Sequence, residues 1–107
     1  MKTTDKIRMQ IQDNPIILYM KGTPALPQCG FSAKAAAAMQ KSGFAFTHVD
    51  VLTAPLIMAA LPEVSDFPTF PQLFVNGEII GGSDIIEAML QSGELQPLLR
   101  AATERNP

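Results

Sequence analysis

The sequence predicts an α/β fold in which one mixed, four-stranded β-sheet is covered by helices on both faces. Short apolar runs alternate with segments of helical periodicity, so the expected order of elements is αβ, αβ, α, ββ, α, α. Strands separated by a helix run parallel, whereas an Asn76-Gly77 hairpin turn adds an antiparallel pair. One mixed sheet between two layers of helices is the simplest arrangement that satisfies both observations.

The first unit combines a helix, a strand and a loop. Thr4-Asp5 can cap a first helix, with Ile7 and Ile11 one turn apart on its buried face. Residues 16–20 (IILYM) form a continuous apolar run, as expected for a strand that is covered on both faces. Two prolines and a glycine within residues 21–28 predict a loop.

The second unit begins after Cys29 with a helix that Ser42-Gly43 is expected to end. Apolar residues recur along this helix at i, i+4, i+7 and i+8, which predicts a buried face. That face consists of Phe31, Ala35, Ala38 and Met39. Residues 44–51 alternate well enough to form a second strand.

The second half of the chain is expected to contain three further helices and the hairpin. Pro55 opens a short helix that ends at Leu61-Pro62. The hairpin strands are residues 73–75 and 78–80. Asp84 and Glu87 resemble a capping box for the next helix, and Gly93 ends it. The last amphipathic helix is expected to run from Glu94 to about Thr103.

Composition excludes several classes of protein. The chain is 47% hydrophobic and 17% charged, which favours a folded core over disorder. Its net charge is −2 and Lys and Arg do not occur in runs, so nucleic acid is not expected as a partner. No apolar stretch approaches the roughly 20 residues of a membrane span, and the polar N-terminus does not resemble a secretory signal. We therefore expect a cytoplasmic protein with no membrane partner.

Cys29 is the only cysteine, so no internal disulfide can form. Its predicted place is the start of a helix, where free N–H groups and the helix dipole stabilise a thiolate. Lys21, at the end of the first strand, can add positive charge. Free cysteines are often buried, but a core cysteine is expected within an apolar stripe, whereas Cys29 precedes its helix beside Gly30. We therefore interpret Cys29 as the reactive residue.

Four sequence blocks form a second pattern: Lys21-Gly22-Thr23-Pro24, Pro27-Gln28-Cys29-Gly30-Phe31-Ser32, Phe67-Pro68-Thr69-Phe70-Pro71-Gln72 and Gly81-Gly82-Ser83-Asp84. Together they resemble the monothiol glutaredoxins with a CGFS active site, in particular the bacterial single-domain members. The resemblance covers essentially the whole chain. It implies a thioredoxin-like (glutaredoxin) fold in one domain over residues 1–107. Four residues alone can match by chance, whereas four blocks at these spacings are much harder to explain otherwise.

The resemblance also implies a glutathione site and a [2Fe–2S] cluster that two subunits share, with one cysteine and one glutathione thiolate from each. Carried over to this sequence, Cys29 is the catalytic residue and the metal ligand. Lys21, Phe70, Ser83 and Asp84 bind glutathione. Helix N–H groups near Ser83 can bind a carboxylate and Asp84 can bind an ammonium group. Phe70 is expected to offer its backbone to the tripeptide, ahead of a cis peptide bond to Pro71.

One position distinguishes this chain from dithiol relatives, and two others depart from the monothiol family. In dithiol relatives a second cysteine, three residues after the first, resolves mixed disulfides, and here that position is Ser32. A lone cysteine can accept glutathione but cannot expel it by itself. Many family members have a glutathione-binding arginine at the position that we align with Met58, so this chain lacks one of the family's contacts to glutathione. Members often have a cysteine where this chain has Ser83.

His48 is the only histidine, and we expect it to lie in a strand without binding a ligand. One cysteine and one histidine cannot provide the four protein ligands of a structural zinc site. No paired-carboxylate catalysis is expected either.

The sequence thus favours a carrier that receives a [2Fe–2S] cluster for iron–sulfur biogenesis and passes it to apo acceptor proteins. Such clusters usually take four thiolates, and two chains with two glutathiones supply them. The expected partners are glutathione, a second copy when the cluster is bound, and, by resemblance, BolA-type proteins. Two alternatives stay open: a glutathione-dependent oxidoreductase that reduces protein–glutathione mixed disulfides, and an interaction module for BolA-type partners.

Overall fold

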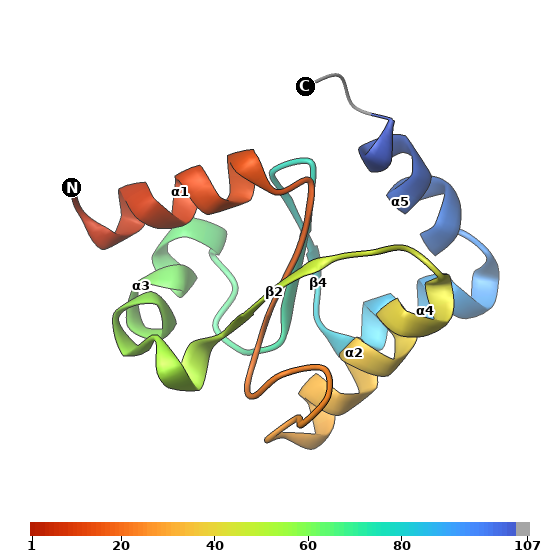
Figure 1. Ribbon diagram of the computed structural model, residues 1–107, viewed down its shortest axis with the longest axis horizontal. Coiled ribbons are helices and arrows are strands. Elements are labelled where there is room, and N and C mark those ends of the chain that lie inside the picture. The colour runs from red at the N-terminus through yellow and green to blue at the C-terminus, as the bar shows by residue number, and fades with distance from the viewer. Residues whose placement is uncertain (105–107) are drawn as a thin grey trace.

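The computed structural model describes residues 1–104 (Figure 1). The last three residues of the predicted 1–107 domain lie outside the described residues. The elements follow the predicted order, with one additional 3-10 turn, η1. They are α1 (Thr3–Asp13), β1 (Ile16–Met20), α2 (Gly30–Ser42), β2 (Thr47–Asp50), η1 (Val51–Thr53), α3 (Pro55–Ser65), β3 (Gln72–Val75), β4 (Glu78–Gly81), α4 (Ser83–Ser92) and α5 (Leu95–Thr103).

The four described strands form one mixed sheet in the order β2-β1-β3-β4. β1 pairs with β2 in parallel and with β3 in antiparallel orientation, and β3 pairs with β4 as the predicted hairpin. Asn76 (φ +51°) and Gly77 (φ +81°) both adopt the left-handed conformation at its turn. A two-residue hairpin of this kind requires positive φ at both positions, which Asn-Gly tolerates. The predicted mixed sheet is confirmed.

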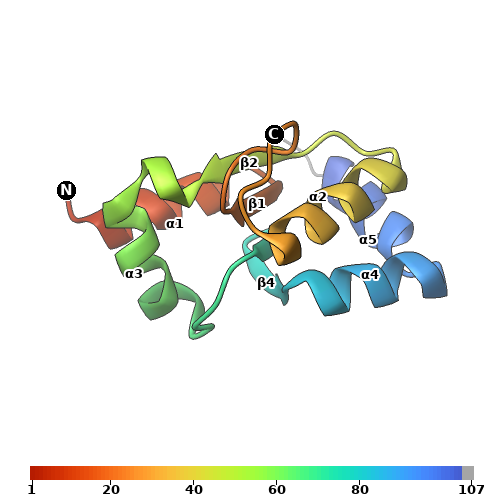
Figure 2. The same cartoon turned by 90° about the horizontal axis from the view of Figure 1, so that it is seen from below.

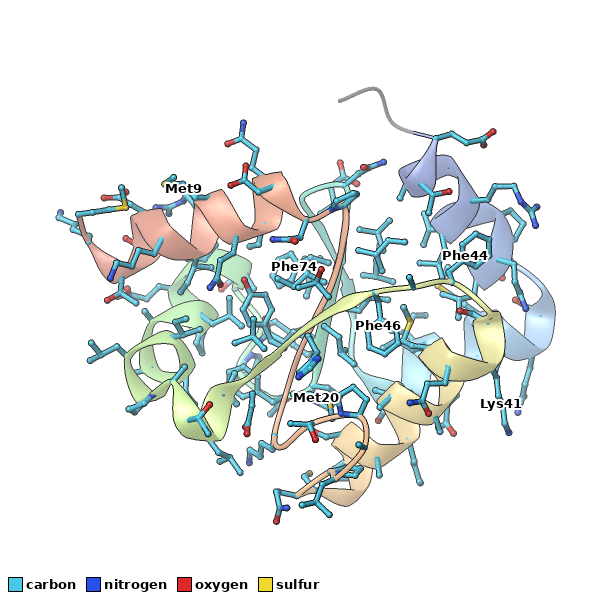
Figure 3. All side chains as sticks on the ribbon, in the orientation of Figure 1. Met9, Met20, Lys41, Phe44, Phe46 and Phe74 are labelled. Carbon is cyan, nitrogen blue, oxygen red and sulfur yellow. The ribbon has the colours of Figure 1, made fainter. Side chains whose placement is uncertain are left out.

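Helices cover both faces of the sheet. Figures 1 and 2 show α1 and α3 on one side and α2, α4 and α5 on the other. Successive side chains of β1 enter two separate cores: Ile17 and Tyr19 pack in the core below α1 and α3, while Leu18 and Met20 pack on the opposite side. Figure 3 shows Phe74 on the α1 side. Burial on both faces explains why the sequence of β1 is continuously apolar.

Two details of the first half differ from the prediction. Helix α1 begins at Thr3 with Lys2 as its N-cap, and the Asp5 carboxylate accepts a hydrogen bond from the Lys2 N–H at 3.2 Å. Thr4-Asp5 is therefore part of the helix and is not its cap. Phe31 is 58% exposed, so it does not belong to the buried face of α2. It lies in the first turn of α2, which extends past the packed part of that helix.

Strand β2 and helix α3 differ in length from the prediction. β2 covers only Thr47–Asp50, because the chain turns into η1 at Val51. Helix α3 continues through Pro62 to Ser65, where we expected it to end at Leu61-Pro62. Proline lacks only its own N–H, and the helix continues for one more turn until the Asp66 N–H bonds the Pro62 carbonyl at 2.9 Å.

Helix α4 is capped differently from the prediction. Gly82 is its N-cap, in an extended conformation, and no side chain caps the first turn. The expected Asp84–Glu87 capping box is therefore absent from α4. The predicted glycine ends are confirmed, since Gly43 (φ +83°) and Gly93 (φ +83°) are the left-handed C-caps of α2 and α4.

Candidate functional site

A cleft of about 1060 Å³ lies where three parts of the fold meet. They are the β1–α2 segment, the loop between α3 and β3, and the start of α4. All five residues that we predicted for the site line this cleft, as does Met58; the five are Lys21, Cys29, Phe70, Ser83 and Asp84. Residues as far apart in the sequence as Lys21 and Ile85, 64 positions, therefore meet at one place, as the sequence blocks predicted.

Cys29 is the N-cap residue of α2, and its backbone is extended (φ −153°, ψ 139°). Its thiol is free and partly exposed. The Ser32 N–H is the strongest influence that holds the pKa of the Cys29 thiol below its ordinary value. Desolvation opposes this effect, while the Phe31 N–H, the Lys21 charge and the Ser32 hydroxyl add to it. The predicted direction of the pKa shift is confirmed, and its main cause is the first turn of the helix.

The loop after β1 folds back on itself and brings Lys21 near Cys29. The Gln28 N–H bonds the Lys21 carbonyl at 3.0 Å, and Gly22 forms an isolated antiparallel bridge with Pro27. Gly22 has φ +89°, and a Cβ on it would lie 2.6 Å from the Gln28 nitrogen. Only glycine fits this turn, which explains its place in the sequence block that starts with Lys21.

Ser32 is fully buried, and its Oγ accepts a hydrogen bond from the Lys21 N–H at 3.0 Å. The sequence marked this position only by the absence of a second cysteine. In the structure its hydroxyl joins the loop to helix α2 and also acts on the Cys29 sulfur. No pattern in a single sequence distinguishes a serine of this kind from an inert replacement.

The loop between α3 and β3 places Phe70 at the cleft. The Phe70–Pro71 peptide bond is cis, as predicted. The buried side chain of Gln72 supports this loop: its Nε2 donates to the Phe67 carbonyl at 2.7 Å and to the Thr69 carbonyl at 3.0 Å. Gln72 ends one of the four sequence blocks, but its supporting role was not predicted. The available signal was a polar side chain at the start of a buried strand.

The opposite wall of the cleft is the N-terminus of α4. Ser83 is buried and Asp84 is exposed. Because no side chain caps this helix, its first-turn N–H groups can receive a negatively charged group of a ligand. Lys21 and Asp84 are the charged residues that line the cleft. One cation, one anion and an open helix N-terminus suit a small ligand that contains both charges.

The described residues do not form a complete set of metal ligands at this site. Within residues 1–104, no group of three or more His, Cys, Asp and Glu side chains is placed to hold a metal ion. His48 is exposed on the edge strand β2, away from the cleft. A metal centre on Cys29 would need ligands from outside the described chain.

None of the helices within residues 1–104 has the length and apolar character to span a membrane.

This arrangement defines a class: a thioredoxin-like α/β protein with a single reactive thiol at a helix N-terminus, beside a cis-proline loop. A glutaredoxin family model matches residues 16–80. "Glutaredoxin 4" of Haemophilus influenzae is 57% identical over 99 residues, which cover 92% of each chain. "Glutaredoxin 4" of Escherichia coli K12 is 54% identical over 98 residues, covering 92% of this chain and 85% of the relative.

Solved structures of glutaredoxins have the same fold as this chain. Reduced poplar apo GrxS14 is 36% identical, with a TM-score of 0.78 and coverage of 92% and 91% of the two chains. A monomeric truncated mutant of Trypanosoma brucei 1-C-Grx1 is 37% identical, with a TM-score of 0.82 and coverage of 94% and 91%. The chain belongs to the glutaredoxin family, as a monothiol member that is similar to the bacterial single-domain proteins.

Proposed function

We propose that this protein is a cytoplasmic, glutathione-dependent carrier of [2Fe–2S] clusters and that it forms a homodimer when a cluster is bound. In this proposal the whole chain, residues 1–107, acts as one glutaredoxin domain. The observation that supports the proposal most is a single partly exposed thiol, with a lowered pKa, at the mouth of a cleft that suits a tripeptide.

The charged groups that line the cleft support glutathione as its ligand. The γ-glutamyl end of glutathione has an ammonium group and a carboxylate, which suit Asp84 and the N–H groups that begin α4 near Ser83. Phe70 would offer its backbone to the cysteine of glutathione. Lys21 would bind the remaining carboxylate or the sulfur. These residues would hold the glutathione thiol close to Cys29.

Ligand count explains the dimer. The cluster is the cargo of this protein, and iron–sulfur clusters usually take four thiolates. One chain supplies only Cys29, so two chains and two bound glutathiones complete the set. Apolar side chains near this site are exposed, which favours contact with another protein surface: Leu26 is 68%, Phe31 58% and Ile85 42% exposed. A second copy, apo acceptor proteins and BolA-type proteins are the partners that we propose.

The experiment is anaerobic purification, followed by a visible absorption spectrum and a count of iron, sulfide and glutathione. We expect a coloured protein with one [2Fe–2S] cluster and two glutathiones per two chains. Cys29→Ser should abolish the colour. Ser32→Ala, which removes a hydroxyl but no thiol, should retain it. A cluster that survives Cys29→Ser would overturn the carrier proposal.

The lowered thiol pKa also favours an alternative, which is a weak reductase of protein–glutathione mixed disulfides. The Cys29 thiolate would attack the glutathione sulfur and release the protein thiol. A second glutathione thiolate would then form glutathione disulfide and regenerate the Cys29 thiolate. A colourless protein with rapid turnover of a mixed disulfide, glutathione and glutathione reductase would favour this function. Stable co-purification of a small partner would favour an interaction module.

A further inference from the structure

The edge strand β2 ends at Asp50, whose carboxylate is bound by two backbone N–H groups. Its Oδ1 accepts a hydrogen bond from the Gly22 N–H at 2.9 Å and another from the Leu52 N–H at 3.0 Å. Asp50 lies opposite Met20, the last residue of β1, in the parallel register. The carboxylate therefore links the end of β2 to the loop that follows β1.

Two successive residues of that loop are held in this way by different elements. The Lys21 N–H donates to the buried Ser32 hydroxyl of α2 at 3.0 Å, and the next N–H, that of Gly22, donates to Asp50 of β2. Hydrogen bonds to a charged acceptor are stronger than those between neutral groups. Within the loop, the Thr23 hydroxyl accepts a hydrogen bond from the Leu26 N–H at 3.1 Å. Gly22 has no side chain, so the bonds to Ser32 and Asp50 tie Lys21-Gly22 to the rest of the fold.

We propose that Asp50 is a positioning residue for the thiol site: together with Ser32, it clamps the backbone of Lys21-Gly22 and thereby holds the Lys21 ammonium group beside Cys29. Asp50 does not line the cleft, whereas Lys21 and Cys29 both do. It therefore acts through Lys21 and has no contact with the reacting atoms. The inference rests on Cys29 as the reactive thiol and is independent of cluster transfer.

Two variants separate the charge of Asp50 from its hydrogen bonds. Asp50→Asn removes the negative charge but keeps an oxygen that can accept from Gly22 and Leu52. Asp50→Ala removes both. Loss of a negative charge favours the Cys29 thiolate equally in the two variants, so the difference between them reports the clamp.

The test is the rate at which iodoacetamide alkylates Cys29 in the full chain, at a pH below the wild-type midpoint. We expect Asp50→Ala to react about two- to fivefold more slowly than Asp50→Asn, the range of effect of a partly exposed charge. In a Lys21→Gln background the two variants should react equally. If Asp50→Ala does not fold, Asp50→Val, which favours strands and lacks an acceptor, takes its place.

If Asp50→Ala and Asp50→Asn are alkylated at equal rates in the chain that retains Lys21, the inference is overturned, even if their melting temperatures differ. A rate difference that persists in full after Lys21→Gln would also overturn it, because Asp50 would then act by another route. Alkylation requires no cluster. A protein that fails to assemble one with iron, sulfide and glutathione would therefore contradict the proposed function and leave this test intact.

Discussion

At the scale of single residues, the chemistry of Cys29 follows from its backbone position. As N-cap it lies against the unpaired N–H groups of the first turn of α2, and the Ser32 N–H is the main group that stabilises its thiolate. Lys21 supplies a smaller effect. A charged neighbour alone would be screened at this exposed place, whereas a directed N–H group remains effective.

The first prediction concerns the pKa of this thiol. The rate of Cys29 alkylation against pH should have a midpoint below ~8.5, the value of a free cysteine. The N–H groups of α2 and the Lys21 charge both favour the anion, so the thiolate should form at lower pH than in an unfolded peptide. Cys29→Ser is the control for background reaction. A midpoint at or above ~8.5 would contradict this account of the site.

The second prediction concerns Met58, which lines the cleft; Lys21 is the one cationic residue among those that line it. If Met58 lies beside the glycine carboxylate of bound glutathione, Met58→Arg should tighten glutathione binding by about 1–3 kcal/mol. Calorimetry in a Cys29→Ser background measures this without disulfide formation. Met58→Leu, which stays apolar, should leave the affinity unchanged. An unchanged affinity for Met58→Arg would mean that the carboxylate lies elsewhere or is already bound by Lys21.

At the scale of elements, side-chain hydrogen bonds support the loop between α3 and β3: the Ser65 hydroxyl bonds Phe67, and the buried Gln72 amide makes two further bonds. Gln72 donates to the carbonyls of Phe67 and Thr69, and these bonds shape the loop that leads to Phe70. The α2 and α4 ends of the cleft are set by helix termini. The cis-proline loop has no regular structure, so side-chain hydrogen bonds must replace backbone pairing.

The third prediction tests that support. Gln72→Met keeps the size of the side chain but leaves the two carbonyls without this donor, so the free energy of unfolding should fall by about 1–3 kcal/mol. Urea denaturation measures it. Gln40→Met is the matched control on the exposed face of α2 and should change stability by less than about 0.5 kcal/mol. Equal effects of the two substitutions would show that Gln72 has no special role in stability.

The elements that the sequence predicted best are those with a strong local cause. The continuous apolar run of β1, the Asn76-Gly77 turn, and the glycine ends of α2 and α4 all match the structure. The starts of helices were predicted less well. Lys2 is an uncommon N-cap residue, and Gly82 caps α4 without any side chain, so neither gives the usual signal.

For the site, the sequence predicted residues that line the cleft but not the residues that support them. Its lining residues came from short blocks that are recognisable as a set, and the structure brings these blocks together. The supporting residues Ser32, Asp50 and Gln72 were missed as such. Their roles depend on hydrogen bonds to residues between 2 and 28 positions away, which a single sequence does not record.

At the scale of the whole molecule, one thiol per chain means that the cluster binding we propose would be an assembly reaction. The described part of the chain offers no cluster of three potential metal ligands, so the remaining ligands must come from outside it. Two of the four would be glutathione thiolates with no covalent link to the protein. Dissociation of either would open an iron site, so in this proposal the bound cluster would be labile and readily transferred. Removal of free glutathione by gel filtration should therefore bleach the protein slowly.

The most direct test of the carrier account is the size of the coloured species. After anaerobic reconstitution with iron, sulfide and glutathione, size-exclusion chromatography with absorbance and light scattering should show a coloured dimer that contains one [2Fe–2S] cluster. The same protein without these components should elute mainly as a colourless monomer, and so should reconstituted Cys29→Ser. A coloured monomer would contradict the account, because one chain would then hold the cluster without a second Cys29.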